Sequence, residues 1–183
     1  MKQFLWFNAI AFSMVFVSRL IIVPFDHINI SIANYIWLPM GAAILAPLLF
    51  GFKSFPGVVL GYFLATFITK GFTWEAVHMY SYMGKFIDSL APIVSILIMR
   101  AFHLSTFFDA GKVKYSHVMF LVILASLIAT FAKVFVYPMQ GKLIPDPVLF
   151  IQSYAASDIF GGIVFIYIAL KLFAPRLIKE KLI

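Results

Sequence analysis

Residues 117–137 read HVMFLVILASLIATFAKVFVY, an apolar stretch interrupted by a single charged residue, Lys133. About twenty such residues cross the ~30 Å hydrocarbon core of a bilayer as an α-helix, so the stretch predicts a transmembrane helix. The whole chain agrees with it, because 63% of its 183 residues are hydrophobic and only 11% are charged. This composition excludes a soluble globular domain.

Outward from this stretch, the chain contains five further apolar stretches joined by short loops. The first begins soon after Lys2, but it is too long for the apolar region of a signal peptide and lacks a small-residue cleavage site, so it counts as a span. The third begins at Pro56, where a helix-starting proline needs no partner for a missing amide. We therefore predict one all-α integral membrane domain over residues 1–183, a polytopic helical bundle. Its predicted spans are residues 4–23, 35–50, 55–69, 80–99, 117–137 and 148–173.

The basic residues of the predicted loops are unevenly divided between the two sides of the membrane. Cytoplasmic loops retain Lys and Arg, and six spans place both termini on one side. The opposite side holds only Lys70 and Lys142 outside the spans. We therefore predict that both termini are cytoplasmic. The basic residues on that side are Lys2, Lys53, Arg100, Lys112, Lys114, Lys171, Arg176, Lys179 and Lys181.

Five ionisable residues fall inside the predicted spans, and all lie in the predicted outer half of the membrane. They are Arg19, Lys85, Asp88, Lys133 and Asp158. The long basic side chains can snorkel to the interface from within about one helical turn of a helix end. The two aspartates lie roughly 12 to 15 Å deep at 1.5 Å per residue, beyond the reach of a short carboxylate. These aspartates must therefore be paired, protonated or in contact with water.

Helical spacing places these residues on common faces. His78, Lys85 and Asp88 share a stripe of the fourth span, and Tyr154 shares a face with Asp158 on the sixth. Two interpretations stay open: a buried ion-pair network that locks the fold, with Arg19, Lys85 and Lys133 as partners of the aspartates, or a ligand site. Three cations against two carboxylates leave one positive charge, which a small anionic ligand or a lipid headgroup would complete. The candidate residues are Asp158, Asp88, Lys85, Lys133, Arg19, Tyr154 and His78.

Several kinds of chemistry find no support in the residues present. Cysteine is absent, which excludes disulfides and thiolate chemistry. The four histidines lie at different predicted depths, and the His-Glu-x-x-His pattern of zinc proteases does not occur. We therefore predict no metal site, no cofactor and no enzymatic activity. The net charge of +7 indicates anchoring to an anionic lipid bilayer and no nucleic-acid partner.

Small residues predict where helices pack closely in lipid. Gly57 and Gly61 form a GxxxG pair on the third span, beside Gly41 on the second. A tight hairpin of the second and third spans is one interpretation, and a dimer seam is the other. Gly161 and Gly162 permit a close approach to the sixth span.

Residues 37–61 read WLPMGAAILAPLLFGFKSFPGVVLG, and residues 157–163 read SDIFGGI. The first stretch resembles the signature of the first class of membrane-associated sensor (MASE) domains, and the second is similar to the last span of that family. Leu38 stands where that family commonly has proline. The resemblance implies an integral membrane sensory module of the bacterial inner (cytoplasmic) membrane, here shortened and without a kinase or cyclase output domain. Such a protein would signal through a partner, with residues 171–181 as a contact region.

Three functions follow from these patterns. The first is a sensor-like or regulatory protein that binds a small ligand or lipid in an outer-half polar pocket. The second is the six-span substrate-binding component of an energy-coupling-factor type transporter, with Ala42, Ala43 and Ala46 as a partner-docking face. The third is a structural subunit of a membrane complex.

Overall fold

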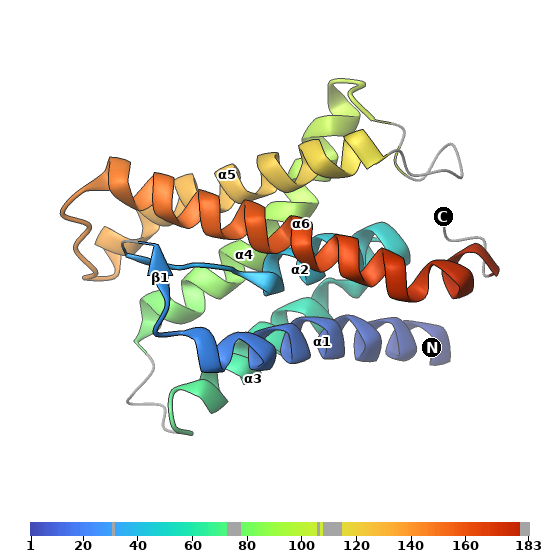
Figure 1. Ribbon diagram of the computed structural model, residues 1–183, viewed down its shortest axis with the longest axis horizontal. Coiled ribbons are helices and arrows are strands. Elements are labelled where there is room, and N and C mark those ends of the chain that lie inside the picture. The colour runs from blue at the N-terminus through green and yellow to red at the C-terminus, as the bar shows by residue number, and fades with distance from the viewer. Residues whose placement is uncertain (31, 73–77, 106, 108–114, 180–183) are drawn as a thin grey trace.

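The computed structural model describes residues 1–30, 32–72, 78–105, 107 and 115–179, which form a bundle of six α-helices (Figure 1). The start of α1 and the end of α6 lie at one end of the bundle, and the short β1–β2 hairpin lies toward the other. The hairpin is antiparallel, with Asn29 opposite Asn34. The helices are α1 (Lys2–Ile22), α2 (Leu38–Phe50), α3 (Phe55–Thr69), α4 (Met79–Ala101), α5 (Tyr115–Met139) and α6 (Pro147–Lys179), with 3-10 turns η1 (Val23–Phe25) and η2 (Phe52–Ser54) and strands β1 (Asn29–Ile30) and β2 (Ala33–Asn34).

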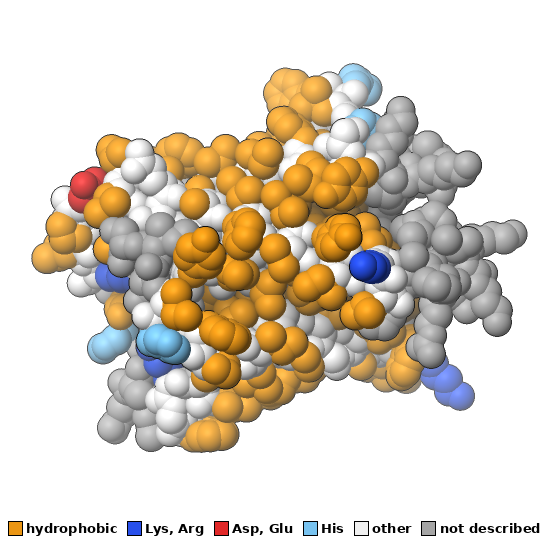
Figure 2. Space-filling model, viewed as in Figure 1, with side chains coloured by type: hydrophobic (Ala, Val, Ile, Leu, Met, Phe, Trp, Pro, Cys, Tyr) orange, Lys and Arg blue, Asp and Glu red, His pale blue; other side chains and the backbone are white. Residues whose placement is uncertain are grey.

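Five helices of the described chain are long and apolar enough to cross a membrane: α1, α3 with the preceding turn η2, α4, α5 and α6. Hydrophobic side chains cover the middle of the face seen in Figure 2, and its basic side chains lie toward the two ends. The prediction of a bundle of long apolar helices is therefore confirmed. The predicted second span is different, because its helix has only 13 residues. At 1.5 Å per residue it is about 20 Å long, shorter than the ~30 Å core of a bilayer.

The helix α2 is short because the residues before it are extended. Tyr35 continues the hairpin by donating its N–H to the carbonyl of Ile28, at 3.0 Å. The N–H of Trp37 donates to the carbonyl of Ser157, in the third turn of α6, at 3.2 Å. Non-helical backbone at such a depth is tolerated only where protein or a wet cavity surrounds it. Pro39 to Leu48 are all buried, so α2 is an internal helix surrounded by the others.

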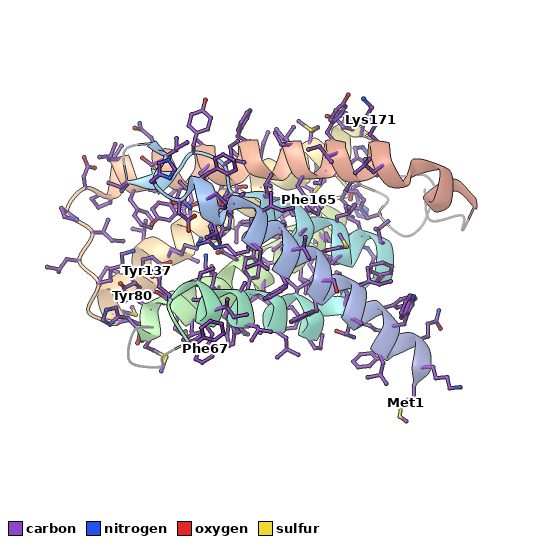
Figure 3. The ribbon with its side chains drawn as sticks, turned by 60° about the horizontal axis from the view of Figure 1, so that its bottom comes forward. Met1, Phe67, Tyr80, Tyr137, Phe165 and Lys171 are labelled. Carbon is purple, nitrogen blue, oxygen red and sulfur yellow. The ribbon has the colours of Figure 1, made fainter. Side chains whose placement is uncertain are left out.

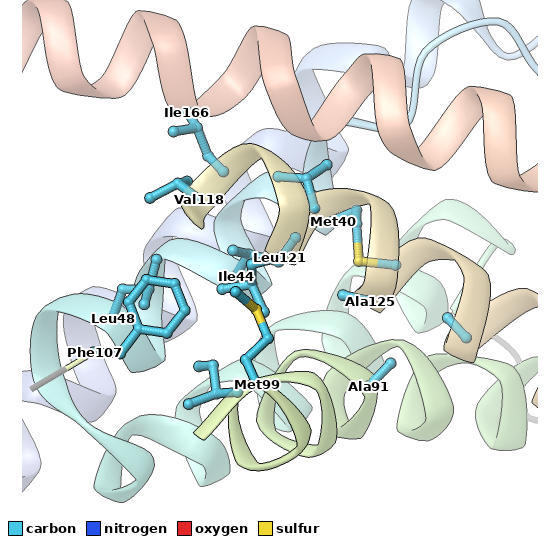
Figure 4. Close-up of a cluster of buried hydrophobic side chains, with 13 residues drawn as sticks. Met40, Ile44, Leu48, Ala91, Met99, Phe107, Val118, Leu121, Ala125 and Ile166 are labelled. Carbon is cyan, nitrogen blue, oxygen red and sulfur yellow. The ribbon is translucent and has the colours of Figure 1, made fainter. Parts of the chain in front are cut away.

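Two hydrophobic clusters surround α2. The larger cluster joins α2 to α4, α5 and α6, with Met40, Ile44, Met99 and Leu121 fully buried (Figure 4). The smaller one joins α2 to α1 and α3 through short side chains, which allow the helices to approach closely. Its members are Ala11, Val15, Ala42, Ala43, Ala46, Val58 and Tyr62. The three alanines of α2 are at most 1% exposed, so the expectation that they form a docking face for a partner is wrong.

The GxxxG pair of α3 packs against α1. A Cβ atom at Gly61 would lie 2.8 Å from the carbonyl oxygen of Phe12, and one at Gly57 would overlap the backbone of Asn8. The Asn8 side chain also accepts the Gly57 N–H at 2.7 Å and donates to the Lys53 carbonyl at 2.9 Å. The glycine pair therefore packs within the chain, but against α1 and not against α2, as the predicted hairpin of the second and third spans required. The same contact leaves no free GxxxG face for a dimer seam.

The remaining predicted packing glycines lie where α2, α5 and α6 meet. A Cβ at Gly41 would lie 2.6 Å from the Cβ of Phe165 and 2.7 Å from the carbonyl oxygen of Gly162. Gly161 faces the backbone of Trp37. A Cβ at Gly162 would lie 2.9 Å from the Cγ1 atom of Val122 on α5. These contacts hold the start of α2 against the middle of α6, and they fix the position of Trp37 along α6.

Candidate functional site

A cavity of about 370 Å³ opens among the helix ends opposite the start of α1. Its wall is polar and draws on α1, the hairpin, α3, α4, α5, α6 and the loop after α5. Five basic and two acidic residues line it, so the wall carries a formal surplus of three positive charges. The lining residues are Arg19, Asp26, Asn34, Trp37, Thr66, Thr69, Lys70, Tyr80, Ser81, Lys85, Lys133, Tyr137, Lys142, Tyr154, Ser157 and Asp158.

A buried ion-pair triad lies at the inner end of this cavity. Asp88 is fully buried; one of its carboxylate oxygens pairs with Lys133, and the other lies 3.3 Å from the Lys85 amine. The Lys133 side chain is 3% exposed and the Lys85 side chain 20%. The Lys85 amine also lies 4.0 Å from the centre of the Trp37 ring. The predicted pairing with the two lysines is therefore present for Asp88, and it compensates a carboxylate that burial would otherwise make very costly.

Asp158 has a different environment. It lines the cavity and is only 2% exposed, yet its Oδ2 atom has no hydrogen-bond partner among the described residues. Within the same part of the chain no basic side chain lies within ion-pair distance of it. The predicted pairing of Asp158 with Lys85, Lys133 or Arg19 is thus not formed. A buried carboxylate oxygen without a donor is costly and rare.

Arg19 pairs with a residue that the sequence did not single out. Its guanidinium donates to Asp26 in a bidentate arrangement, at 2.8 and 2.5 Å. The Asn34 amide donates to the same carboxylate at 2.7 Å. The expectation that Arg19 is a charge partner of Asp88 or Asp158 is therefore wrong. The turn η1 brings Asp26 back over the end of α1, seven residues after Arg19, before the chain enters the hairpin.

Two tyrosines and a lysine stand at the outer end of the cavity. The rings of Tyr80 and Tyr137 pack edge to face, 5.7 Å apart (Figure 3). The Lys142 amine lies 4.6 Å from the centre of the Tyr137 ring and 5.0 Å from that of Tyr80. Burial, followed by the positive charges of Lys133 and Lys70, lowers the pKa of Lys142. Lys142 and Lys70 have no carboxylate within ion-pair distance in the described part of the chain.

The last two predicted site residues, Tyr154 and His78, lie in different places. Tyr154 lines the cavity, with its ring 5.7 Å from the Lys133 amine. His78 is exposed, stacks on Tyr80 at 5.3 Å and does not line the cavity. It is the extended residue before α4, with ψ of 146°, so the helical stripe of Lys85 and Asp88 does not extend back to it.

Sequence reasoning missed Asp26, Asn34, Lys70 and Lys142 as site residues. A signal for the two lysines was present, because they are the only basic residues outside the spans on the predicted outer side. Basic residues there depart from the usual distribution in membrane proteins. Both lysines line the cavity.

The fold and the site together define a helical bundle, with five helices long and apolar enough to cross a membrane and a basic cavity at one end. Comparisons with models of known protein families, with curated proteins and with solved structures found no match.

Proposed function

We propose that this chain is an integral membrane protein of sensor-like or regulatory function, whose cavity binds a small anionic ligand and whose helices pass the binding event to a partner protein. The observation that carries the proposal is the lining of the cavity by five basic and two acidic residues. Even when the buried Asp88 is counted as a third carboxylate, two positive charges are left over. Ionisable residues that face the interior of a membrane bundle commonly belong to a substrate or ion site.

The proposed orientation places the cavity on the outer side of a bacterial inner membrane and both chain ends in the cytoplasm. Lys53 and Arg100 lie in the turn before α3 and at the end of α4, at the same end of the bundle as the start of α1. Lys112, Lys114 and Lys181, which also support this orientation, lie outside the described residues. We count α2 and the extended residues before it as the sixth membrane-embedded segment.

The cavity is built so that an anion would contact several helices at once. Lys70 follows α3 and Lys142 follows α5, and the Lys142 amine lies over the rings of Tyr80 on α4 and Tyr137 on α5. An anion bound at the two lysines would therefore connect α3, α4 and α5. The helix α6 begins beside the cavity and continues without a break to Lys179, at the other end of the bundle. A change in the position of α6 at the cavity would therefore move its far end, where a partner can bind.

Binding can be tested on the full chain in nanodiscs with succinate, sulfate and phosphate as probes. We expect succinate to raise the melting temperature in a saturable manner, and the K142Q variant to weaken its binding about tenfold, the cost of one lost charge-assisted contact. K171Q is the matched control, because Lys171 is exposed at the opposite end of the bundle (Figure 3). If no anion binds, or if K171Q weakens binding as much as K142Q, the proposal is wrong.

The partner can be tested by purifying the tagged protein in mild detergent with and without the anion, followed by mass spectrometry. A kinase or cyclase whose recovery changes with the anion supports the sensor function. An ATPase pair would instead support the energy-coupling-factor alternative, and a large stable complex a structural subunit. The transporter alternative has lost one of its supports, since Ala42, Ala43 and Ala46 are buried against α1 and α3.

A further inference from the structure

Each end of the cavity contains a polar group without a partner. The inner end lacks a hydrogen-bond donor, and the outer end lacks an anion. At the inner end, the carboxylate of Asp158 is 2% exposed, and its Oδ2 atom has no donor among the described residues. At the outer end, Lys70 and Lys142 have no carboxylate within ion-pair distance in that same part of the chain. All three residues line one cavity. If the cavity binds an anionic ligand, as proposed above, that ligand must satisfy both ends.

The inner end requires a hydrogen-bond donor and has no need of a further negative charge. Lys85 and Lys133 together balance the charges of Asp88 and Asp158, but both lysines are bound to Asp88. The inner end is therefore close to neutral, and the Oδ2 atom of Asp158 is a buried acceptor without a donor. An anionic group placed there would face the carboxylate of Asp158. A donor such as a protonated amine would satisfy it, in the strongest class of hydrogen bond.

The outer end requires an anion. Lys142 lies over the rings of Tyr80 and Tyr137, close enough to Lys70 and Lys133 for their charges to lower its pKa. A bound carboxylate or phosphate would relieve this repulsion.

The separation of the two ends follows from the rings along α6. Tyr137 packs edge-on against Phe150, 5.9 Å away, which places Lys142 near the level of Phe150. Phe150 stacks on Tyr154 one turn further on, and Asp158 is another turn beyond it. Eight residues of helix amount to about 12 Å. A single compact anion at the rim therefore leaves Asp158 without a donor, whereas an extended molecule reaches both ends.

We propose that the ligand is a small zwitterion, whose anionic group binds at Lys70 and Lys142 and whose ammonium group donates to Asp158. A free amino acid of the ω-amino type carries these two groups, and so does the phosphoethanolamine headgroup of a lipid.

The proposal is tested by comparing 4-aminobutyrate with succinate, two molecules of equal chain length that differ at one end. Titration calorimetry of the full chain in phosphatidylglycerol nanodiscs is expected to show about tenfold tighter binding of 4-aminobutyrate. D158N should abolish this preference while succinate still binds. K142Q should weaken the binding of both molecules and leave the ratio of their dissociation constants unchanged. That result would assign the preference to the inner end.

Equal or tighter binding of succinate by the parent protein overturns the zwitterion but leaves the proposed anion binding intact. Retention of the preference in D158N also overturns it. Failure of every anion to bind overturns both proposals. A second arm repeats the titration in discs that contain phosphatidylethanolamine. Suppressed 4-aminobutyrate binding in those discs assigns the site to the lipid headgroup, and unchanged binding assigns it to a free zwitterion.

Discussion

The backbone N–H of Trp37 donates to the carbonyl of Ser157, so α2 begins beside the third turn of α6 and not beside its first residue. Gly161, one turn further along α6, has no side chain to separate the two backbones. This contact sets the depth at which Trp37 and Asp158 meet in the cavity.

Gly161→Ala is expected to destabilise the protein by about 3 kcal/mol, because the added methyl would overlap the rigid backbone of Trp37. Thermal unfolding followed by tryptophan fluorescence in detergent measures the change. Ala156→Val is the control, since Ala156 is exposed on the same helix. A Gly161→Ala variant as stable as this control would show that the two backbones do not touch.

Asp88→Asn is expected to cost about 3–5 kcal/mol, because it leaves Lys133 buried with no full negative charge beside it. The double variant Asp88→Asn with Lys133→Met should recover part of that loss. The readout is the folded fraction on denaturant titration in detergent. If the double variant is as unstable as Asp88→Asn alone, the ion pair is not the source of the effect.

Asp158→Asn is expected to leave stability unchanged or to raise it by about 1 kcal/mol, since an amide is less costly to bury than a carboxylate without a donor. The same unfolding measurement separates the two interpretations of the polar cluster. A loss comparable to that of Asp88→Asn would make Asp158 part of the structural lock. Retained stability with altered ligand preference would make it a binding residue.

Succinate binding is expected to weaken as the pH rises from 7 to 10. An anion prefers protonated Lys142, so affinity is constant below the pKa of Lys142 and falls as the pH passes through it. Because burial and the neighbouring lysine charges lower that pKa, the fall begins at a lower pH than for an ordinary lysine. Dissociation constants measured in nanodiscs across this range test the effect.

Lys142→Arg separates this titration from that of other groups. A guanidinium stays charged throughout the range, so the variant should bind succinate with nearly constant affinity. Lys171→Arg is the control and should retain the pH dependence of the parent protein. An unchanged decline in Lys142→Arg would assign the titration to another residue.

Much of the helical architecture and of the local chemistry can be predicted from the amino-acid sequence alone. Apolar stretches of spanning length predicted the long helices, and the three-residue spacing of Lys85 and Asp88 placed both on one face of α4. The glycines Gly57 and Gly161 were recognised as packing positions. These features depend only on helix periodicity and on the thickness of the bilayer. They can therefore be predicted from one stretch of sequence at a time.

Which of these residues contact one another depends on the tertiary structure. Arg19 pairs with Asp26, Asp88 takes both lysines and Asp158 is left without a donor. Pairing between helices depends on their relative rotation and depth, and glycine contacts set both. A Cβ has no room at those contacts, but the sequence does not say which helix fills the space. For the same reason α3 packs on α1, and α2 is an internal helix whose start lies at the cavity.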